Sequence, residues 1–477
     1  MAISRKFNSH FDSHFASWNG SNRFTGKQQT RSQSRLLFGE AALTNPLKMP
    51  DLVKPILEKS DDFKLAMACS LQGMDKQQAL LKIFNPPYKS TILSRKPIIQ
   101  IERHQTPEDT LKRLAQATPI ALGDLHASVR KLVETLVMTN LVEMPFETAQ
   151  TFVTLTDKLD QKQSIEGAHV IKAALEKLIP HMKWIGGKRQ LILMGDTLSD
   201  RGPLDSLTMD IIQYLRKQAK NPEAIIVLAS NHDHHALNFI RTGENYLPDL
   251  LCRSLLNDMA LAATSKDTES MPKLWHKYYD YLKQTKLLYL DADKTLYTHA
   301  RVTDAHIQKL TTLLRDCPQK LPSLVNLTEK WTLEKVKIFI GKANSLYQKH
   351  VKDEMEQCDC PEWPKQPAWK VKLEQFLVGD KQSNKTRPGF LWTRKPYEEK
   401  AELPFSDSSL KALVHGHAYD GKDCVKILHG EPLSQGHYSV FNLDQQVRKG
   451  SLPILETRES ILFTPSLPNG NFIPAKL

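Results

Sequence analysis

The sequence predicts an α/β fold, in which short buried strands alternate with helices. From about residue 115, short apolar runs end abruptly in polar turns, and two of these turns lead into segments with helical spacing. Each run also has Asp, His or Asn soon after its last apolar residue. Such loops commonly carry the functional side chains of open α/β sheets, because the strands hold the loop bases in place.

The first expected strand is residues 119–122, and the turn Gly123-Asp-Leu-His126 follows it. Ser128 is expected to cap a helix, because the apolar residues behind it have the i, i+3, i+4 and i+7 spacing of one helix face. These residues are Val129, Leu132, Val133 and Leu136.

The second expected strand opens the stretch from Leu191 to Gly202, where four apolar residues precede a turn with two carboxylates and a guanidinium. A helix is expected next, since apolar residues recur at positions 207, 211 and 215. Three further strands are expected at 224–229, 295–298 and 412–414, and they end in Ser230-Asn-His-Asp233, His299 and His415-Gly-His417.

The side chains at these five strand ends include the types that bind divalent ions. Such ions prefer carboxylate oxygen, imidazole nitrogen and amide oxygen as ligands. A single Gly-Asp turn, or a lone histidine, is more often only structural. Five such strand ends in one chain favour a metal site.

The composition limits the class of protein. With 477 residues and 40% hydrophobic content, the chain can bury one large core or two. No apolar run approaches the roughly 18 residues of a membrane span, and no export signal begins the sequence, so we expect no transmembrane segment and no Sec export. The net charge of +12 favours anionic partners. Basic residues are not interleaved with aromatic ones, so nucleic acid is not an expected partner.

Six cysteines are scattered along the chain without the density of a disulfide scaffold, which is typical of a reducing compartment such as the cytoplasm. They are Cys69, Cys252, Cys317, Cys358, Cys360 and Cys424. The C-x-C pair at 358 and 360 is not expected to bind metal, because zinc sites use wider spacings and a second pair.

The order of the five turns resembles the metallophosphoesterases, and specifically the PPP group of phosphoprotein phosphatases. The group has the motifs GDxH, GDxxDRG, Gly-Asn-His-Asp/Glu, a lone His and GH. Here they stand as Gly123-Asp-Leu-His126, Gly195-Asp-Thr-Leu-Ser-Asp-Arg-Gly202, Ser230-Asn-His-Asp233, His299-Ala-Arg301 and Gly416-His417. Phe390-Leu-Trp-Thr-Arg394 is similar to the W-x-R element of bacterial members.

The resemblance implies a calcineurin-like metallophosphoesterase fold, with two mixed β-sheets packed face to face, helices outside and helical insertions. It also implies two divalent metal ions, with Mn²⁺ expected and Fe or Zn as alternatives. The implied ligands are Asp124 and His126 for the first ion, Asp196 as the bridge, and Asn231, His299 and His417 for the second.

The remaining roles are implied in the same way. Direct attack of a metal-bound hydroxide on phosphorus is the implied reaction, with Arg201 and Arg394 binding the phosphoryl oxygens. His232 would protonate the leaving oxygen, and Asp200 would orient His232 by accepting from its other ring nitrogen.

Three positions depart from the family pattern. Ser230 and Ala127 each stand where Gly is usual, which matters only if the backbone there needs a positive φ. Arg301 also stands where the family usually has Gly, and we expect its side chain to point into solvent or to form a structural salt bridge. His415 is expected to be a packed neighbour, and three acids are left structural or unassigned: Asp205, Asp233 and Asp444.

Four regions are expected along the chain. A basic, disordered arm covers residues 1–40, and a helical extension covers 41–114. The catalytic domain covers 115–455, with helical insertions at about 130–188 and 303–385, and a polar tail covers 456–477.

The predicted function is a dimetal-dependent phosphatase acting on phosphoproteins, at Ser/Thr or at Tyr. One alternative is hydrolysis of nucleotides, dinucleoside polyphosphates or cyclic phosphodiesters, and another is a lapsed phosphatase that only binds phosphoproteins. The insertions and the Ser/Asn-rich arm also resemble bacterial effector phosphatases that a specialised secretion system delivers into host cells. The sequence does not predict an oligomeric state.

Overall fold

The computed structural model describes the core of the chain and several short strands outside it. The described residues are 91–93, 101–102, 119–160, 164–242, 247, 252–265, 267, 270–317, 331–357, 368–379, 389–393, 405, 410, 412–417, 427–429, 439–442, 454–456 and 461–464. The arm predicted at 1–40 lies outside them.

A seven-stranded sheet forms one half of the centre, in the order β2-β1-β14-β13-β3-β6-β7. Its strands are β1 (Thr91–Leu93), β2 (Ile101–Glu102), β3 (Ile120–Leu122), β6 (Leu191–Leu193), β7 (Ile225–Val227), β13 (Ile454–Glu456) and β14 (Ile461–Thr464). The strands β3, β6 and β7 are mutually parallel and fully buried, as expected for apolar runs in the middle of a sheet.

Two predicted regions differ from the structure at the other edge of this sheet. The described residues of the 41–114 extension form strands, β1 and β2, where helix was predicted. The tail predicted at 456–477 contributes β14, which lies between β1 and β13. Ile461–Thr464 is a short apolar run of the kind that forms strands, and pairing on both sides provides its backbone hydrogen bonds.

A second, five-stranded sheet has the order β11-β12-β10-β9-β8. Its strands are β8 (Leu288–Leu290), β9 (Thr295–Thr298), β10 (Ala412–His415), β11 (Ile427–His429) and β12 (Ser439–Asn442). Here β9, β10 and β12 are parallel. A separate pair joins β4 (Val142–Glu143) to β5 (Lys183–Trp184). All five strands predicted to carry the site are therefore confirmed.

Helices cover the sheets on both sides. They are α5 (Val129–Met138), α6 (Phe146–Asp160), α7 (Ile165–Leu178), α8 (Asp205–Ala219), α9 (Asn231–Thr242), α10 (Arg253–Thr264), α11 (Ser270–Leu282), α12 (Asp304–Asp316), α13 (Leu333–Gln357) and α14 (Ala368–Val378), with 3₁₀ turns η1 (Ile179–His181) and η3 (Phe390–Trp392). The side chain of Ser128 accepts from the Lys131 backbone N–H, which confirms the predicted cap.

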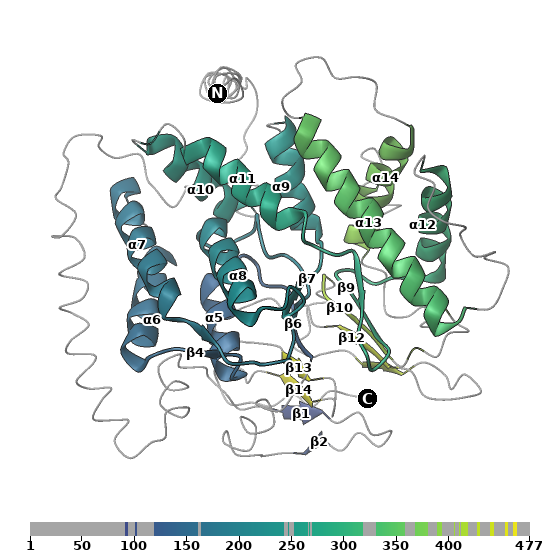
Figure 1. Ribbon diagram of the computed structural model, residues 1–477, viewed down its shortest axis with the longest axis horizontal. Helices are drawn as coiled ribbons and strands as arrows, with labels where there is room; N and C mark the ends of the chain where they lie inside the picture. Colours follow the sequence, from purple (N-terminus) through teal and green to yellow (C-terminus); the bar gives the residue numbers. More distant parts are fainter. Residues whose placement is uncertain are drawn as a thin grey trace, which may run out of the picture.

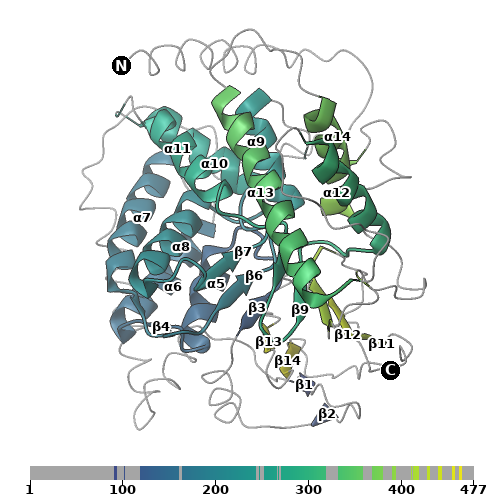
Figure 2. The same cartoon turned by 45° about the vertical axis from the view of Figure 1, so that its right-hand side comes forward.

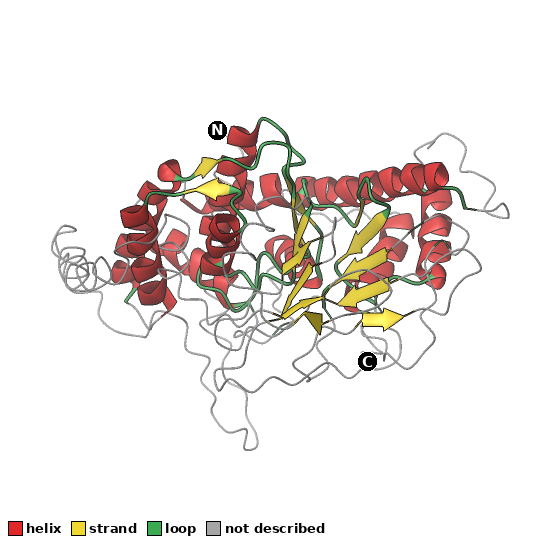
Figure 3. Ribbon diagram, turned by 90° about the horizontal axis from the view of Figure 1, so that it is seen from below, coloured by secondary structure: helices red, strands yellow, loops and turns green. Residues whose placement is uncertain are grey.

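The arrangement is layered. Figures 1 and 2 place α5 to α8 on the side of the larger sheet, and α12 to α14 on the side of the smaller one. Figure 3 shows the two groups of strands next to each other between the helices. A backbone bridge from Leu228 to Lys286 links the end of β7 to the segment before β8. The fold is thus mixed α/β with two mixed sheets, and the helices α5 to α7 and α12 to α14 lie within the two predicted insertions.

None of the described helices is long and apolar enough to cross a membrane. Cys252 and Cys317 are buried free thiols, and the pair Cys358 and Cys360 lies outside the described residues.

Candidate metal centre

Loops from the two sheets meet at the carboxyl ends of β3, β6, β7, β9 and β10. The Leu125 N–H donates to Gly195 O (3.2 Å), which joins the first loop to the second. The Gly416 N–H donates to His299 O (2.7 Å), which joins the fourth loop to the fifth. The site is therefore held by backbone bonds between segments far apart in sequence.

Two glycines allow these loops to approach closely. Gly195 has φ of +117°, and a Cβ atom there would lie 2.4 Å from His299 Nδ1. A Cβ on Gly416 would lie 1.9 Å from Asp124 Oδ1. Any larger residue at either position would displace a predicted ligand, which explains the glycine in each motif.

His299 lies where the two sheets meet and contacts two other predicted ligands. Its Nδ1–H donates to the Met194 carbonyl (2.9 Å), which directs its Nε2 toward the other predicted ligands. That Nε2 lies 2.7 Å from Asn231 Oδ1 and 3.5 Å from Asp196 Oδ1. An imidazole nitrogen, an amide oxygen and a carboxylate oxygen thus converge, and these are atom types that bind divalent cations.

Asp200 is hydrogen-bonded to His126, whereas its predicted partner was His232. His126 Nδ1–H donates to Asp200 Oδ2 (2.7 Å), and both residues are buried. The lone pair of His126 is then on Nε2, which is buried and makes no hydrogen bond with any residue that the structure describes. Histidines that bind a metal through one ring nitrogen commonly donate the N–H of the other nitrogen to a carboxylate.

Asp124 and His417 border both halves of the site. The His417 backbone N–H donates to Asp124 Oδ2 (3.0 Å), and Asp124 Oδ1 lies 3.9 Å from His299 Nδ1. The His417 ring lies 5.0 Å from the His299 ring and meets Trp392 edge-on at 5.8 Å. His417 has φ of 63°, a left-handed conformation that is strained for histidine and is found mostly at functional sites.

His232 is held by the backbone and not by Asp200, so the predicted orienting bond is wrong. Its Nδ1–H donates to the Ser199 carbonyl (2.7 Å), while Asp200 Oδ2 lies 3.7 Å from Nε2. The turn that follows β6 directs this carbonyl at the ring, with Ser199 at φ of 52°. Asp200 consequently acts on His232 by charge and on His126 by hydrogen bonding.

The charges in the site are strongly coupled. Burial alone would raise the pKa of Asp196, but four nearby imidazoles lower it well below its usual range. These belong to His232, His299, His126 and His417. Burial likewise lowers the pKa of His232, but the charges of Asp200 and Asp196 reverse this, and the net shift is upward. The site therefore favours ionised carboxylates and a proton on His232.

Of the two predicted phosphate-binding arginines, the structure describes only Arg201. Arg201 has a side chain 41% exposed, and its Nη1 lies 3.1 Å from His126 Nδ1, so its guanidinium is at the solvent side of the site. Arg394 lies outside the described residues, although Trp392 of the same W-x-R element packs on His417.

Arg301 differs from the prediction of an exposed or salt-bridged side chain. It is only 4% exposed, and its Nε and Nη1 atoms make no hydrogen bonds with the residues that the structure describes. Within the described part of the chain it forms no ion pair. Burial, together with the nearby charge of Arg301, lowers the pKa of His415 to about 4. His415 itself is fully buried in β10, in agreement with its expected role as a packed neighbour.

The other two departures from the family pattern, Ala127 and Ser230, differ in backbone conformation. Ala127 has φ of 54°, so a glycine there would relieve strain. Ser230 is not among the residues with positive φ, and its side chain accepts from the Asp233 N–H at the start of α9. Serine is therefore a suitable residue at the helix cap.

Three buried residues support the site: Asp233 and Asp205, which the sequence left as structural or unassigned, and Lys131, which it did not single out. Asp233 accepts from Thr197 Oγ1 (2.9 Å) and the Leu198 N–H (3.0 Å), which joins the second loop to the third. Lys131 is 3% exposed and donates to the Asp124 carbonyl (2.6 Å). Asp205 accepts from the Ser199 N–H and from Tyr278. Only Asp233 had a sequence signal, as the last residue of its motif.

These atoms could hold metal ions. Asp124, Asp196 and His299 each offer a ligand atom within 4.8 Å of the others, and so do His126, Asp196 and Asp200. Asp196 belongs to both groups, as a bridging ligand would, and its buried Oδ1 accepts no hydrogen bond from the described residues. The donor set of carboxylate, imidazole and amide suits a pair of divalent ions.

Several solved structures are similar to the chain, among them the following three. The phosphatase domain of the Legionella effector WipB is 18% identical, with a TM-score of 0.44, and the match covers 64% of this chain and 99% of that one. A cold-active protein tyrosine phosphatase is 17% identical over 72% of this chain and 75% of that one, with a TM-score of 0.37. A cold-active protein-tyrosine phosphatase of a psychrophilic Shewanella species is 15% identical over 79% and 88%, with a TM-score of 0.37.

No curated protein matches the chain. Residues 190–449, more than half of the 477, match the family described as "WipA-like, phosphatase domain". The matched region contains the second to fifth motifs, and the first motif, with Asp124 and His126, lies before it. The chain belongs to the WipA-like phosphatase-domain family.

Proposed function

We propose that this protein is a dimetal-dependent phosphoprotein phosphatase of the PPP group, with a calcineurin-like metallophosphoesterase fold, and that it hydrolyses phosphomonoesters. Membership of the WipA-like phosphatase-domain family supports the reaction class. The observation that carries the metal dependence is the convergence of His299 Nε2, Asn231 Oδ1 and Asp196 Oδ1 in a buried position.

The proposed ligands are the six predicted from the motifs, with Mn²⁺ as the expected ion. Asp124 and His126 would hold one ion, Asp196 would bridge, and Asn231, His299 and His417 would hold the other. Two bound divalent ions supply Lewis acidity toward the phosphoryl oxygens and lower the pKa of a shared water.

The chain's own residues would bind the substrate and move the proton. Arg201, at the solvent side, would donate to two phosphoryl oxygens through its planar fork. The Ser199 carbonyl holds His232 by Nδ1, so Nε2 is the atom that would carry the proton to the leaving oxygen. Asp200 and Asp196 favour this protonated form, since their charges raise the pKa of His232.

Hydrolysis of phosphoserine, phosphothreonine and phosphotyrosine peptides, compared with nucleotides in the presence of Mn²⁺, tests the proposal. We expect peptide hydrolysis that a chelator abolishes and Mn²⁺ restores. Faster hydrolysis of dinucleoside polyphosphates or cyclic phosphodiesters would favour the nucleotide alternative. Peptide binding without turnover would indicate a lapsed phosphatase.

We also propose delivery into a host cell, on the basis of the resemblance to effector phosphatases. Fusion to a translocation reporter would test this in a bacterium with the relevant secretion system. The reporter signal should require that system, and retention in the bacterial cytoplasm would contradict delivery.

A further inference from the structure

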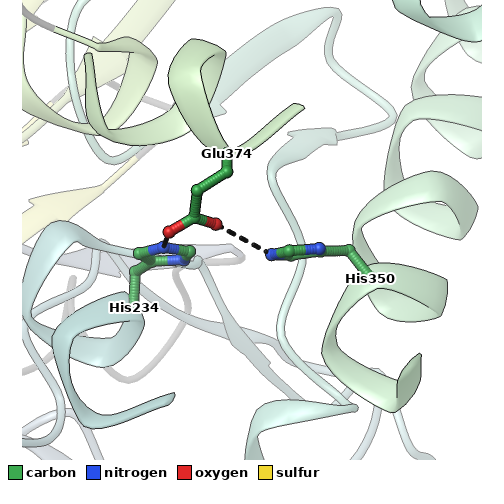
Figure 4. Close-up of side chains that lie close together, drawn as sticks. All are labelled: His234, His350 and Glu374. Atoms are coloured by element: carbon green, nitrogen blue, oxygen red, sulfur yellow. Dashed lines mark hydrogen bonds and ion pairs between the residues drawn. The ribbon is translucent and has the colours of Figure 1, made fainter. Parts of the chain in front are cut away.

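Three side chains from three helices converge on another side of α9. His234 belongs to α9, His350 to α13 and Glu374 to α14. His234 follows His232 by two positions, which sets side chains about 200° apart around a helix. Figure 4 shows the Glu374 carboxylate between the two imidazole rings. The cluster is therefore separate from the candidate metal centre, although α9 contributes to both.

The distances in this cluster suit a shared ion. His234 Nε2 lies 3.1 Å from Glu374 Oε1, and His350 Nε2 lies 3.2 Å from Glu374 Oε2. All three residues offer a ligand atom within 4.8 Å of the others. Two ligands of a tetrahedral Zn²⁺ ion, each about 2.1 Å from the metal, are about 3.4 Å apart. Small side-chain rotations would thus bring the two nitrogens and one carboxylate oxygen into this geometry.

Burial of the two imidazoles is energetically unfavourable unless their nitrogens are hydrogen-bonded or bound to a metal ion. His234 and His350 are each 1% exposed. Neither ring nitrogen of His350 makes a clear hydrogen bond with a described residue, although Nε2 lies 3.2 Å from Glu374 Oε2 and Nδ1 lies 4.0 Å from Glu354 Oε1. His234 Nδ1 also makes none. Buried imidazoles are normally hydrogen-bonded or bound to metal, and a metal bond would satisfy the Nε2 atom of His350.

The basic neighbours of the cluster are paired with other acids. Arg241 pairs with Glu354 at 2.6 Å, and Lys370 lies 3.5 Å from Asp353 and 3.7 Å from Glu354. The Glu374 side chain is 24% exposed, so solvent reaches the cluster from one side. A water molecule entering there would supply a fourth ligand.

We infer that His234, His350 and Glu374 form a zinc site that joins α13 and α14 to α9. Two imidazoles, one carboxylate and a water are a common zinc ligand set. The site would stabilise the start of α9, which also carries Asn231 and His232. It is independent of the proposed phosphatase reaction, because it requires only that the three helices pack as they do.

Zinc binding to the full chain tests this site. The Asp196→Asn variant, stripped of metal, weakens the candidate metal centre and leaves the cluster intact. We expect it to bind Zn²⁺ in a calorimetric titration and Co²⁺ with the visible absorption of a tetrahedral site. Adding Glu374→Gln should weaken Zn²⁺ binding at least about 100-fold, as expected for loss of a ligand.

Controls separate ligand loss from unfolding. His181→Ala, in the same Asp196→Asn background, removes an exposed histidine outside the cluster and should leave zinc affinity unchanged. His350→Ala should abolish binding, and its circular dichroism spectrum shows whether it folds. If His350→Ala does not fold, the zinc affinity of the Glu374→Gln variant is the test of the site. Equal zinc affinity in the Glu374→Gln variant, or no Zn²⁺ binding by its Asp196→Asn parent, would overturn the inference and leave a network of buried ion pairs.

Discussion

Asp200 accepts a hydrogen bond from His126 at 2.7 Å, across 74 positions of the chain. The same carboxylate oxygen lies 3.7 Å from His232 Nε2. One acid therefore orients a predicted metal ligand and also stabilises the protonated form of the predicted acid catalyst. Because the two effects have different readouts, substitution of Asp200 separates them.

Asp200→Asn should weaken binding of one metal ion by about 10- to 100-fold, the usual effect of losing a carboxylate behind a histidine ligand. The alkaline limb of the activity profile should also move to lower pH, because the charge of Asp200 helps to raise the pKa of His232. Metal titration and a pH series of kcat/KM measure the two effects. Unchanged metal affinity would mean that Asp200 acts through His232 alone.

Asp196→Asn should abolish turnover, because a neutral amide can no longer hold two cations close together. Metal analysis of the purified variant should show at least one ion lost. Asp205→Asn is a suitable control, since it replaces another buried acid but should keep both ions. Full activity with two ions in Asp196→Asn would disprove the bridging role.

His232→Ala should lower kcat by roughly 10² to 10⁴ on alkyl phosphates, as expected for loss of a general acid. The loss should be smaller for an aryl phosphate, whose leaving group needs less protonation. Ser199→Ala is the matched control, because the His232 bond is to the Ser199 backbone carbonyl and survives the change. Equal losses on both substrates would assign His232 to positioning.

Arg301→Met should raise the free energy of unfolding by about 1 to 3 kcal/mol, because it replaces a buried guanidinium with two nitrogens that make no hydrogen bond within the described part of the chain. KM for phosphomonoesters should stay nearly constant. Arg216→Met is the contrasting control: that guanidinium donates to the Ile225 carbonyl, so its loss should destabilise the protein. Denaturant titrations measure both changes. A several-fold rise in KM that fades at high salt would instead make Arg301 a substrate contact.

Asp205→Asn should change how stability depends on pH. Burial, with the charge of Asp258, raises the pKa of Asp205 from 3.8 to about 8. Between these two pH values Asp205 is protonated in the folded protein but ionised in the unfolded chain. The free energy of unfolding therefore falls as pH rises, by at most about 1.4 kcal/mol per pH unit. Asp205→Asn cannot ionise, so its free energy of unfolding does not fall for this reason. Its amide oxygen can still accept from Ser199 and Tyr278.

The midpoint of thermal unfolding should therefore fall less between pH 5 and pH 8 in Asp205→Asn than in the wild type. Asp210→Asn, which removes a partly exposed ion pair with Lys277, should follow the wild-type trend. Parallel curves for wild type and Asp205→Asn would show that Asp205 is ionised in the folded protein.

Several elements of the fold could be predicted because their causes are local. The Ser128 cap, the five strands at the site and the helices behind the first two turns depend on residues within a few positions of one another. The position of all six predicted ligands just after a strand also follows from local pattern, and parallel strands present their carboxyl ends at one edge of a sheet.

Other features were decided only by tertiary packing. The partner of Asp200 lies 74 positions away, and Glu374 meets His234 across 140 positions. The burial of Arg301 and the pairing of Ile461–Thr464 with β1 likewise depend on segments far apart in the chain. Side-chain patterns set the period and the ends of each element, whereas contacts between elements depend on how whole helices and sheets fill space together. For this protein, the sequence determined which side chains reach the strand ends, and the three-dimensional packing decided which of them touch.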